Sequence, residues 1–454
     1  MSTSTQSSLQ AAGEVNIEKL FLVSNKGIVS LSDYLIELNI YESIFNNVVS
    51  GDILISDSRN LIKEFSIVGD EYLIIQATTP GLDNSLSKTY RITSVEDRML
   101  VRDQNTQIYK LRFVSQEALI DVLCPLFNSF SGSVETIVNK IFTDNLEINR
   151  TLNHDDSHKK LTQSDEKTKL VVFSESSNKL KFVSPGWTPM QCINWLTKKA
   201  LPKSGKACNF LFWESNRSFY FGTLESIFTN GQTIGTYNYQ AFDIRGPTDD
   251  ISEKMALIQR VDILNGLDHL DNLDNGYFAS KLVSLDIIKK QRNITDYDHV
   301  TQFPSYKHLS KENPKPLFNE KSAIRNLNSH IRIYPTSTGL HTDTPKNYNE
   351  IMGDIYGNRL SNLIELNSLK LNISIYGRTD VEAGRIMDIK FPDMSPVDET
   401  DMTSEHVDSR YSGRYLITSI HHKINIAKHI MTMEVIRDSL SASSKDRANS
   451  PGEF

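Results

Sequence analysis

Hydrophobic and polar residues alternate along much of the N-terminal part of the chain. In the run YLIELNIYES, from Tyr34 to Ser43, every second residue from Ile36 to Ile40 is Ile or Leu. This period of two is typical of a strand with one buried face. Further strand-like runs follow up to Val114, and turn residues separate them. The pattern predicts a small antiparallel barrel or sandwich over residues 15–120.

A helical period replaces this alternation in the next part of the chain. Behind Ser133, a good N-cap residue, apolar side chains recur at Val134, Ile137, Val138 and Ile141. A second helix is predicted in GWTPMQCINWLTKKALP, with Thr188 as its cap and Pro189 in its first turn. Two strands follow it in ACNFLFWESNRSFYFG. A helix packed on a hairpin predicts an α+β insert domain over residues 121–252.

Strand patterns return after the insert, so we expect an α+β, mainly β fold with two antiparallel β-barrel domains. The second barrel is predicted in two parts, residues 253–299 and 366–440, on either side of an extended loop and helix insert over 300–365. The Ser-rich ends, residues 1–14 and 441–454, are expected to be a disordered arm and a disordered tail.

The two ends of the chain carry similar strand sequences. YLITSIHHKI at 415–424 resembles YRITSVEDRM at 90–99. The segments before them, GRIMDIKFP and GDEYLIIQA, and after them, HIMTMEVIRDS and QIYKLRFVSQE, also match in the same order. Three matched segments in one order indicate two copies of one strand module.

Two adjacent histidines, His421 and His422, fall opposite Glu96 and Asp97 in this alignment. Adjacent residues of a strand point to opposite faces, so the two imidazoles cannot bind one metal ion from a regular strand. We therefore expect polar surface histidines and no metal site.

The composition narrows the functional classes. The net charge of −7 provides no global basic field for nucleic acid. No apolar run reaches the roughly 18 residues of a membrane-spanning helix, and the Ser/Thr-rich start does not resemble a signal peptide, so no membrane anchor is expected. Three cysteines, Cys124, Cys192 and Cys208, without C-x-x-C spacing favour plain thiols of a protein folded in a reducing cytoplasm.

The sequence offers no catalytic motif. The nucleophile-elbow, H-E-x-x-H, dinucleotide-binding and P-loop patterns are absent. His154 and His158 could share a helix face and bind a metal, but their polar flanks favour a solvated loop. The aromatic run YNYQAF at 237–242 favours a core strand over a carbohydrate platform. We therefore predict no catalytic, cofactor-binding or metal-binding residues, no cofactor and no enzyme activity.

Several phrases resemble the central baseplate hub protein of T-even-like contractile-tailed phages. They are SGDILISDSRNL, GDEYLIIQA, YRITSVEDR, the helix and hairpin of the insert, NGYFASKLVSLDI, YGRTDVEAGRIMDIKFP and GRYLITSIHH. More distantly, the chain is similar to the hub part of VgrG proteins and to the late-control protein D group. The resemblance covers most of residues 15–440.

The resemblance implies a structural virion protein of the tail baseplate. Such proteins form homotrimers in which two tube-protein-like barrels per chain make a ring of six. The implied partners are a tail tube or tube-initiator protein, a central spike protein that can carry a lysozyme, and inner baseplate wedge proteins. DNA would pass through without specific binding. Because no glycine-rich β-helical array follows Ser439, the spike is expected to be a separate chain.

An acidic channel would let DNA slide without sticking, and three copies at −7 would carry −21. The candidates for lumen-lining acidic residues are Glu37, Asp52, Glu71, Glu382 and Asp388. A generally solvated acidic surface is the alternative. Two other functional classes remain open, a tail-associated cell-wall hydrolase and a receptor-binding tail module.

Overall fold

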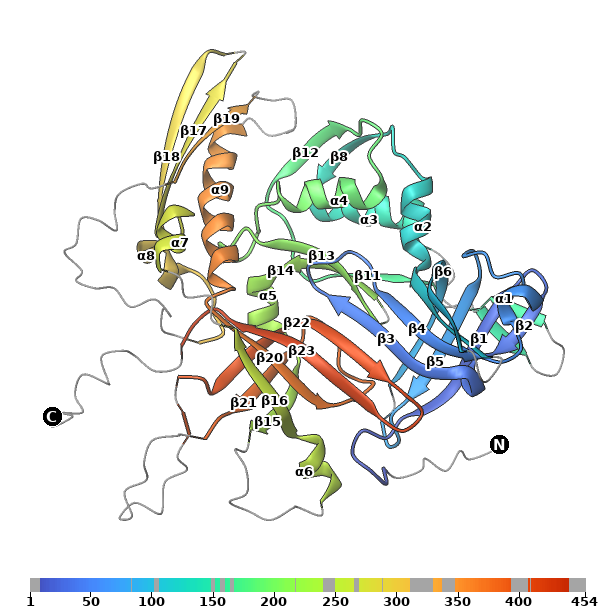
Figure 1. Ribbon diagram of the computed structural model, residues 1–454. Helices are drawn as coiled ribbons and strands as arrows, with labels where there is room; N and C mark the ends of the chain where they lie inside the picture. The colour runs from blue at the N-terminus through green and yellow to red at the C-terminus, as the bar shows by residue number, and fades with distance from the viewer. Residues whose placement is uncertain are drawn as a thin grey trace, which may run out of the picture.

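Two β-sheet modules lie side by side and carry the rest of the chain (Figure 1). We call residues 15–115 module 1, and residues 233–264 with 369–437 module 2. The computed structural model describes residues 9–82, 84–101, 106–147, 152–155, 160–163, 167–216, 218–239, 250–264, 269–287, 289–310, 330–336, 348–392, 407–408 and 410–440.

Module 1 is a curved antiparallel sheet of seven strands around one core. Its strand order is β2-β1-β5-β6-β7-β4-β3. The strands are β1 (Asn16–Ser24), β2 (Gly27–Ser30), β3 (Leu35–Ser43), β4 (Ser50–Asp57), β5 (Tyr72–Thr78), β6 (Ser85–Val101) and β7 (Thr106–Ser115). The period-2 alternation in the sequence places residues such as Leu38, Ile53 and Leu111 in the core. In the described residues, β2 and β3 do not pair, so the strands form no closed hydrogen-bonded ring.

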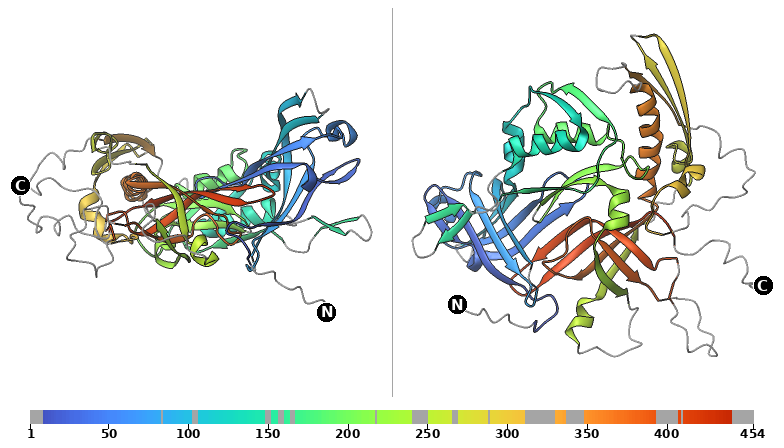
Figure 2. Two further views of the ribbon diagram at one scale, coloured as in Figure 1. Left: turned by 60° about the horizontal axis from the view of Figure 1, so that its bottom comes forward. Right: turned by 180° about the vertical axis from the view of Figure 1, so that it is seen from behind.

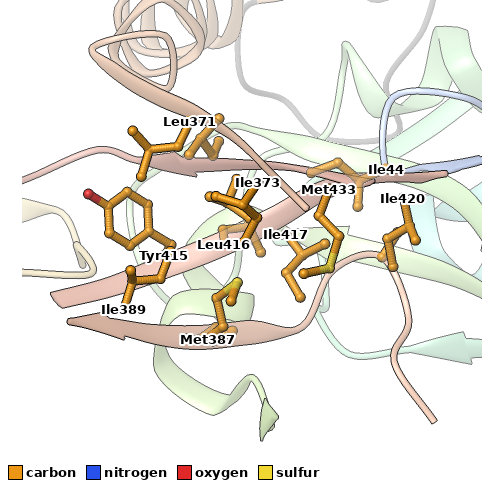
Figure 3. Close-up of a cluster of buried hydrophobic side chains, with 14 of the residues drawn as sticks. Ile44, Leu371, Ile373, Met387, Ile389, Tyr415, Leu416, Ile417, Ile420 and Met433 are labelled. Atoms are coloured by element: carbon orange, nitrogen blue, oxygen red, sulfur yellow. The ribbon is translucent and has the colours of Figure 1, made fainter. Parts of the chain in front are cut away.

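Module 2 does close into a ring of six strands. The ring runs β22-β21-β15-β16-β20-β23 and returns to β22. Its strands are β15 (Thr233–Tyr239), β16 (Leu257–Leu264), β20 (Leu369–Tyr376), β21 (Ile386–Lys390), β22 (Gly413–Ile424) and β23 (His429–Arg437). Strand β15 pairs in parallel with both of its neighbours. The barrel is therefore only partly antiparallel, whereas the sequence predicted a wholly antiparallel one. Leu371, Met387 and Met433 belong to its core (Figure 3).

The strand segments are divided between sheets differently from the sequence prediction. Strand β15 completes the barrel, although it was assigned to the insert domain. Strands β17 (Ala279–Asp286) and β18 (Gln291–Asp298) were expected in the barrel, but they form a separate sheet with β19 (His330–Thr336). Helix α9 (Tyr348–Glu365), which the sequence predicted, packs on that sheet. Period-2 alternation identifies a strand but not the sheet it joins.

The α+β insert follows module 1, and its helices agree with the sequence prediction. Helix α3 (Val134–Ile141) buries its four apolar residues, and helix α4 (Pro189–Thr197) starts with a capping box at Thr188. Strands β13 (Phe210–Ser215) and β14 (Ser218–Thr223) form the predicted hairpin. The remaining elements are α2 (Gln116–Leu123), β8 (Ser129–Ser133), η2 (Phe142–Leu146), β9 (Leu152–Asp155), β10 (Lys160–Gln163), β11 (Lys169–Val172), β12 (Lys179–Val183) and α5 (Leu224–Asn230).

A buried ionic cluster joins this insert to module 1. Lys88 of β6 forms an ion pair with Glu214 of β13, and its Nζ lies 3.7 Å from a carboxylate oxygen of Glu117. Glu214 also accepts hydrogen bonds from the Ser115 hydroxyl at 2.5 Å and from the Val49 amide at 2.8 Å. Buried charges are tolerated when they are paired and hydrogen-bonded in this way. The cluster therefore holds the insert against module 1.

The terminal segments differ in part from the expected disordered ends. Residues 9–14 are described and pack against module 2, where the Gly13 carbonyl accepts a hydrogen bond from the His429 amide at 2.8 Å. Residues 1–8 and the predicted tail at 441–454 lie outside the described residues. Module 1 and the β17–β19 sheet lie at opposite ends of the molecule (Figure 2).

Five strands of each module share the same topology. In both modules the five strands, numbered along the chain, take the sheet order 3-4-5-2-1 with every pair antiparallel. The equivalent strands, in chain order, are β3, β4, β5, β6 and β7 in module 1, and β16, β20, β21, β22 and β23 in module 2. This agreement supports the duplicated module that the sequence indicated.

The register of the two modules agrees as well. A β-bulge falls at Thr93 in the Ile-Thr-Ser segment of β6 and at Thr418 in the Ile-Thr-Ser segment of β22. A second bulge falls at Ile36 in β3 and at the equivalent Gln259 in β16. Bulges bend and twist a strand at a defined position. Matching bulges therefore indicate one ancestral module.

We expect the stability of the fold to decrease between about pH 6.5 and pH 9 because of His308. Burial alone would lower its pKa, but the hydrogen bond and charge of Asp438, 2.8 Å from Nδ1, raise the pKa of His308 from 6.5 to about 9. A pKa that folding raises adds stability below the unfolded-state pKa, and this is lost as pH rises through the folded-state pKa. The change should be about 3 kcal/mol at most.

Urea unfolding at pH 6 and at pH 9.5, at one fixed protein concentration, would measure this effect. The matched variant is His308→Gln, which keeps a polar side chain but cannot titrate. We expect its pH dependence to be shallower than that of the wild type. Equal pH dependence in both proteins would contradict the role assigned to His308.

Candidate functional site

The two modules join edge to edge through strands β3 and β22. Six residue pairs form this antiparallel seam, from Ser43 opposite Ser419 to Leu38 opposite Ile424. Each module also contributes a side chain to the core of the other. Ile424 of β22 is buried in the core of module 1, and Ile44, which follows β3, is buried in the core of module 2 (Figure 3). The seam is thus held by backbone hydrogen bonds and by reciprocal apolar burial.

The seam creates a continuous sheet of eight antiparallel strands that spans both modules. Its order is β6-β7-β4-β3-β22-β23-β20-β16, and every adjacent pair is antiparallel. One face of the sheet covers the two apolar cores. The other, which we call the polar face, includes the directly paired row Arg91, Val114, Ser50, Tyr41, His421, Thr432, Ser374 and Arg260.

A polar network crosses the seam on this face. The Asn39 side-chain amide donates to Glu37 at 3.0 Å and to Asp52 at 3.1 Å, so its carbonyl oxygen is left as the acceptor for His421 Nε2 at 2.8 Å. His421 must then carry its proton on Nε2. Its ring also stacks on Tyr41, with centroids 4.6 Å apart. Asp52 accepts a further hydrogen bond from the Tyr41 hydroxyl at 3.3 Å.

The pKa shifts of the side chains in this network favour a neutral His421. Burial and the nearby Lys423 lower the pKa of His421. Burial alone would raise the pKa of Glu37, but hydrogen bonds from Lys423 and Asn39 lower it, and the Lys423 ion pair is 2.7 Å long. Burial and the Asp52 carboxylate raise the pKa of Tyr41 to about 12. At neutral pH the Glu37 carboxyl is therefore ionised and the His421 imidazole is uncharged.

Charges of both signs are distributed over the polar face. Ion pairs join Glu96 to Arg112 at 2.8 Å, Glu434 to Lys370 at 2.6 Å, Asp262 to Arg260 at 3.1 Å, and Asp70 to Arg91. With the Glu37–Lys423 pair, most carboxylates here have a basic partner. The face is therefore mixed in charge rather than predominantly acidic.

The structure brings together two of the five predicted acidic residues and separates the other three. Glu37 and Asp52 meet in the seam network. Glu71 is buried, where its carboxylate accepts three backbone amides of residues 68–70, so it cannot line a channel. The Glu382 carboxylate accepts hydrogen bonds from the Tyr220 hydroxyl and from the Arg385 side chain. It lies beside a cleft of about 370 Å³ between the insert and the barrel. Asp388 lies on β21, outside the eight-strand sheet.

The two adjacent histidines do point to opposite faces, but only His421 is on the polar face. His422 is fully buried, so the prediction of two surface histidines was wrong for this residue. Its Nδ1 lies 3.1 Å from Nε2 of His429, which is also buried. Burial, and for each ring the neighbouring histidine, lowers the pKa of His422 to about 3 and that of His429 well below its usual value. A buried neutral pair is a packing feature.

The other candidate residues have simple structural roles where they are described. Residues 152–155 and 160–163 form a hairpin, so His154 lies on a strand rather than in the expected loop, and His158 lies outside the described residues. Tyr237 is buried in the core of module 2, in agreement with the core-strand prediction.

Among the described residues there is no group of three His, Cys, Asp or Glu side chains that could hold a metal ion. No described helix could span a membrane.

A comparison with curated proteins identifies a relative of nearly equal length. The "Probable baseplate hub protein gp334" of Vibrio phage KVP40 is 22% identical over 429 residues, which cover 90% of this chain and 91% of the relative. The chain is similar to a phage baseplate hub protein. The resemblance inferred from the sequence is thus confirmed. No model of a known protein family matches the chain.

Two solved structures cover almost the whole chain at low identity. The tail protein from Neisseria meningitidis MC58 is 12% identical with a TM-score of 0.49, and the alignment covers 92% of this chain and 96% of that one. The 43 kDa tail protein of prophage MuSo2 from Shewanella oneidensis is 10% identical with a TM-score of 0.49, covering 94% and 100%.

Truncation of Ile424 should weaken the seam between the modules. Ile424→Ala removes a side chain that is fully buried in the core of the other module, so we expect a loss of about 2–4 kcal/mol in the free energy of unfolding. Hydrogen exchange of the β3 and β22 amides should accelerate more than exchange elsewhere in module 2.

The matched control is Ile426→Ala, two residues along the same hairpin, where the side chain is exposed. Its effect should stay within about 0.5 kcal/mol. Equal destabilisation by both variants, or unchanged exchange along the seam, would contradict the reciprocal burial.

Proposed function

We propose that the chain is a structural central hub of a contractile-tailed phage baseplate. In this proposal three copies form a ring with pseudo-sixfold symmetry, which adapts a sixfold tail tube to a threefold central spike. The observation that carries the proposal is the duplicated five-strand module, with matching strand order and matching bulges, joined edge to edge within one chain. Its similarity to a phage baseplate hub protein supports it.

The symmetry follows from counting modules. Two similar modules per chain give six similar units in a homotrimer, so one face of the ring can meet a sixfold partner while the assembly keeps a threefold axis. The eight-strand sheet of each chain ends in two edge strands, β6 and β16. Joining three chains would place every edge strand of that sheet against a neighbour, which removes the aggregation hazard of open edges.

The polar face is proposed as the wall of the central channel. Its ion pairs leave a surface of mixed charge, which attracts the DNA backbone less than a basic surface would. DNA could then pass without specific binding, although not by the repulsive acidic wall that the sequence suggested. The proposed partners are a tail tube or tube-initiator protein, a spike protein and inner baseplate wedge proteins, and the proposed location is the virion tail baseplate.

The mass of the purified protein in solution tests the ring. Size-exclusion chromatography with light scattering should give three times the chain mass of 51.5 kDa. Class averages by electron microscopy should show an annulus with six lobes and threefold symmetry. A stable monomer or dimer, or an assembly without a threefold axis, would contradict the proposal.

The hydrolase and receptor-binding alternatives predict different results in simple assays. A hub should release no soluble sugar or peptide from purified peptidoglycan, and a wall hydrolase should release both. A receptor-binding module should be retained on host glycan, whereas a hub should be retained by tail tube or spike protein.

A further inference from the structure

The buried ionic cluster between module 1 and the insert places an amine beside two carboxyl groups. Lys88 comes from β6, Glu117 from α2 and Glu214 from β13, and their side chains are 6%, 2% and 1% exposed. The Lys88 Nζ forms an ion pair with Oε1 of Glu214 and lies 3.7 Å from Oε2 of Glu117. An amine and a carboxyl group that are held together away from water can condense to an amide.

The two oxygens of the Glu214 carboxyl group have different surroundings. Oε2 accepts hydrogen bonds from the Ser115 hydroxyl at 2.5 Å and from the Val49 amide at 2.8 Å, whereas Oε1 faces the Lys88 amine. The Ser115 oxygen also accepts a hydrogen bond from Lys88 at 3.1 Å, which holds the amine against this carboxyl group. Two donors fixed on one oxygen stabilise the negative charge that a nucleophile would place there. Oε1 is then the oxygen that would leave.

Glu117 is placed to move protons during such a reaction. Its Oε1 accepts a hydrogen bond from the Thr168 hydroxyl at 2.9 Å, whereas its buried Oε2, the atom near Lys88, accepts none from any described residue. In a purely structural cluster, a buried carboxylate oxygen without a donor is costly. Beside an amine, the same oxygen can act as a general base and then as a general acid.

We propose that Lys88 and Glu214 form a covalent amide bond between their side chains after the chain folds, with Glu117 as the proton shuttle. First, one proton passes from Nζ to Oε1 of Glu214, which gives a neutral amine and a carboxylic acid. Nζ then attacks Cδ of Glu214, so that the C–N bond forms and Oε2 carries the negative charge. Glu117 takes a second proton from Nζ and passes it to Oε1, the Cδ–Oε1 bond breaks, and Oε1 leaves as water.

The reaction balances within the cluster. Two of the ammonium protons leave with the water and one stays on the amide nitrogen, while Glu117 returns to its starting state. The condensation therefore requires no oxidant, reductant or external reactant. Burial assists the first step, because loss of hydration disfavours the charged forms of buried groups. An exposed ion pair contains the same groups, but there water hydrates both charges and competes with the amine.

The bond would join module 1 to the hairpin of the insert covalently. An amide between residues 88 and 214 closes a loop that contains helices α2, α3 and α4. Closing such a loop restricts the unfolded chain and thereby stabilises the folded one. A force that pulls the insert away from module 1 would also have to break a covalent bond. This linkage lies within one chain and does not depend on the proposed ring.

Mass spectrometry of the purified wild type tests the bond directly. With its N-terminal processing taken into account, the denatured chain should be lighter by one water molecule than the mass calculated from its sequence. Trypsin should give a branched peptide that joins residues 64–91, uncleaved after Lys88, to residues 207–217. The exposed ion pair of Lys203 with Glu175 is the internal control, and its peptides should stay separate. A full sequence mass with unlinked peptides would overturn the proposal.

Variants separate the reaction from the fold, which circular dichroism checks. Lys88→Arg keeps a buried cation but lacks the attacking amine, so it should show the full mass and migrate more slowly than the looped wild type on a denaturing gel. Lys203→Arg, at the exposed control pair, should keep the loss of water. Glu117→Gln keeps the shape of the shuttle without its basic oxygen, so linkage after cell-free synthesis should be at least about a hundredfold slower.

The outcomes bear on separate parts of the inference. Linkage in Glu117→Gln at the wild-type rate would overturn the role of Glu117 as the shuttle. A loss of water in Lys88→Arg equal to that of the wild type would place the bond elsewhere and overturn the assignment to Lys88. The wild-type peptides decide whether the bond exists even where a variant does not fold.

Discussion

Antiparallel pairing of β3 with β22 is the interaction on which the arrangement of the chain depends. It fixes the register between the modules over six residue pairs and extends one sheet through eight strands. It also orders the polar network of Asn39, His421 and Asp52, because these side chains come from three strands that meet only there. Both apolar cores are completed across it by Ile44 and Ile424.

Much of the fold could be predicted because it depends on local patterns. Alternation identified the strands of module 1, the helical period identified the buried residues of α3, and the Thr188 cap located the start of α4. The similarity of residues 90–99 and 415–424 indicated the duplication, and the bulges at Thr93 and Thr418 support it at the same aligned position. Repeated sequence of this kind reports on structure because the same side chains satisfy the same backbone geometry.

The errors arose where long-range pairing decides the outcome. Strands β17 and β18 have the alternation of barrel strands, but they pair with the distant β19. His422 is buried because His429 of the next strand accommodates its ring, and a polar residue on a strand gives no signal of such a partner. Glu71 and Glu37 are both carboxylates in strand-like parts of the sequence, yet one accepts hydrogen bonds from backbone amides in the interior and the other pairs with Lys423.

The insertion between β16 and β20 has a consequence for shape. Module 2 carries residues 265–368 at this point, including α9 and the β17–β19 sheet, whereas the matching connection in module 1, residues 44–49, is a short loop. The two modules thus share one five-strand framework but differ in the size of the segment inserted into it. In a circular array built from such pairs, helix α9 and the β17–β19 sheet would recur three times rather than six, so an arriving partner would meet a threefold feature there.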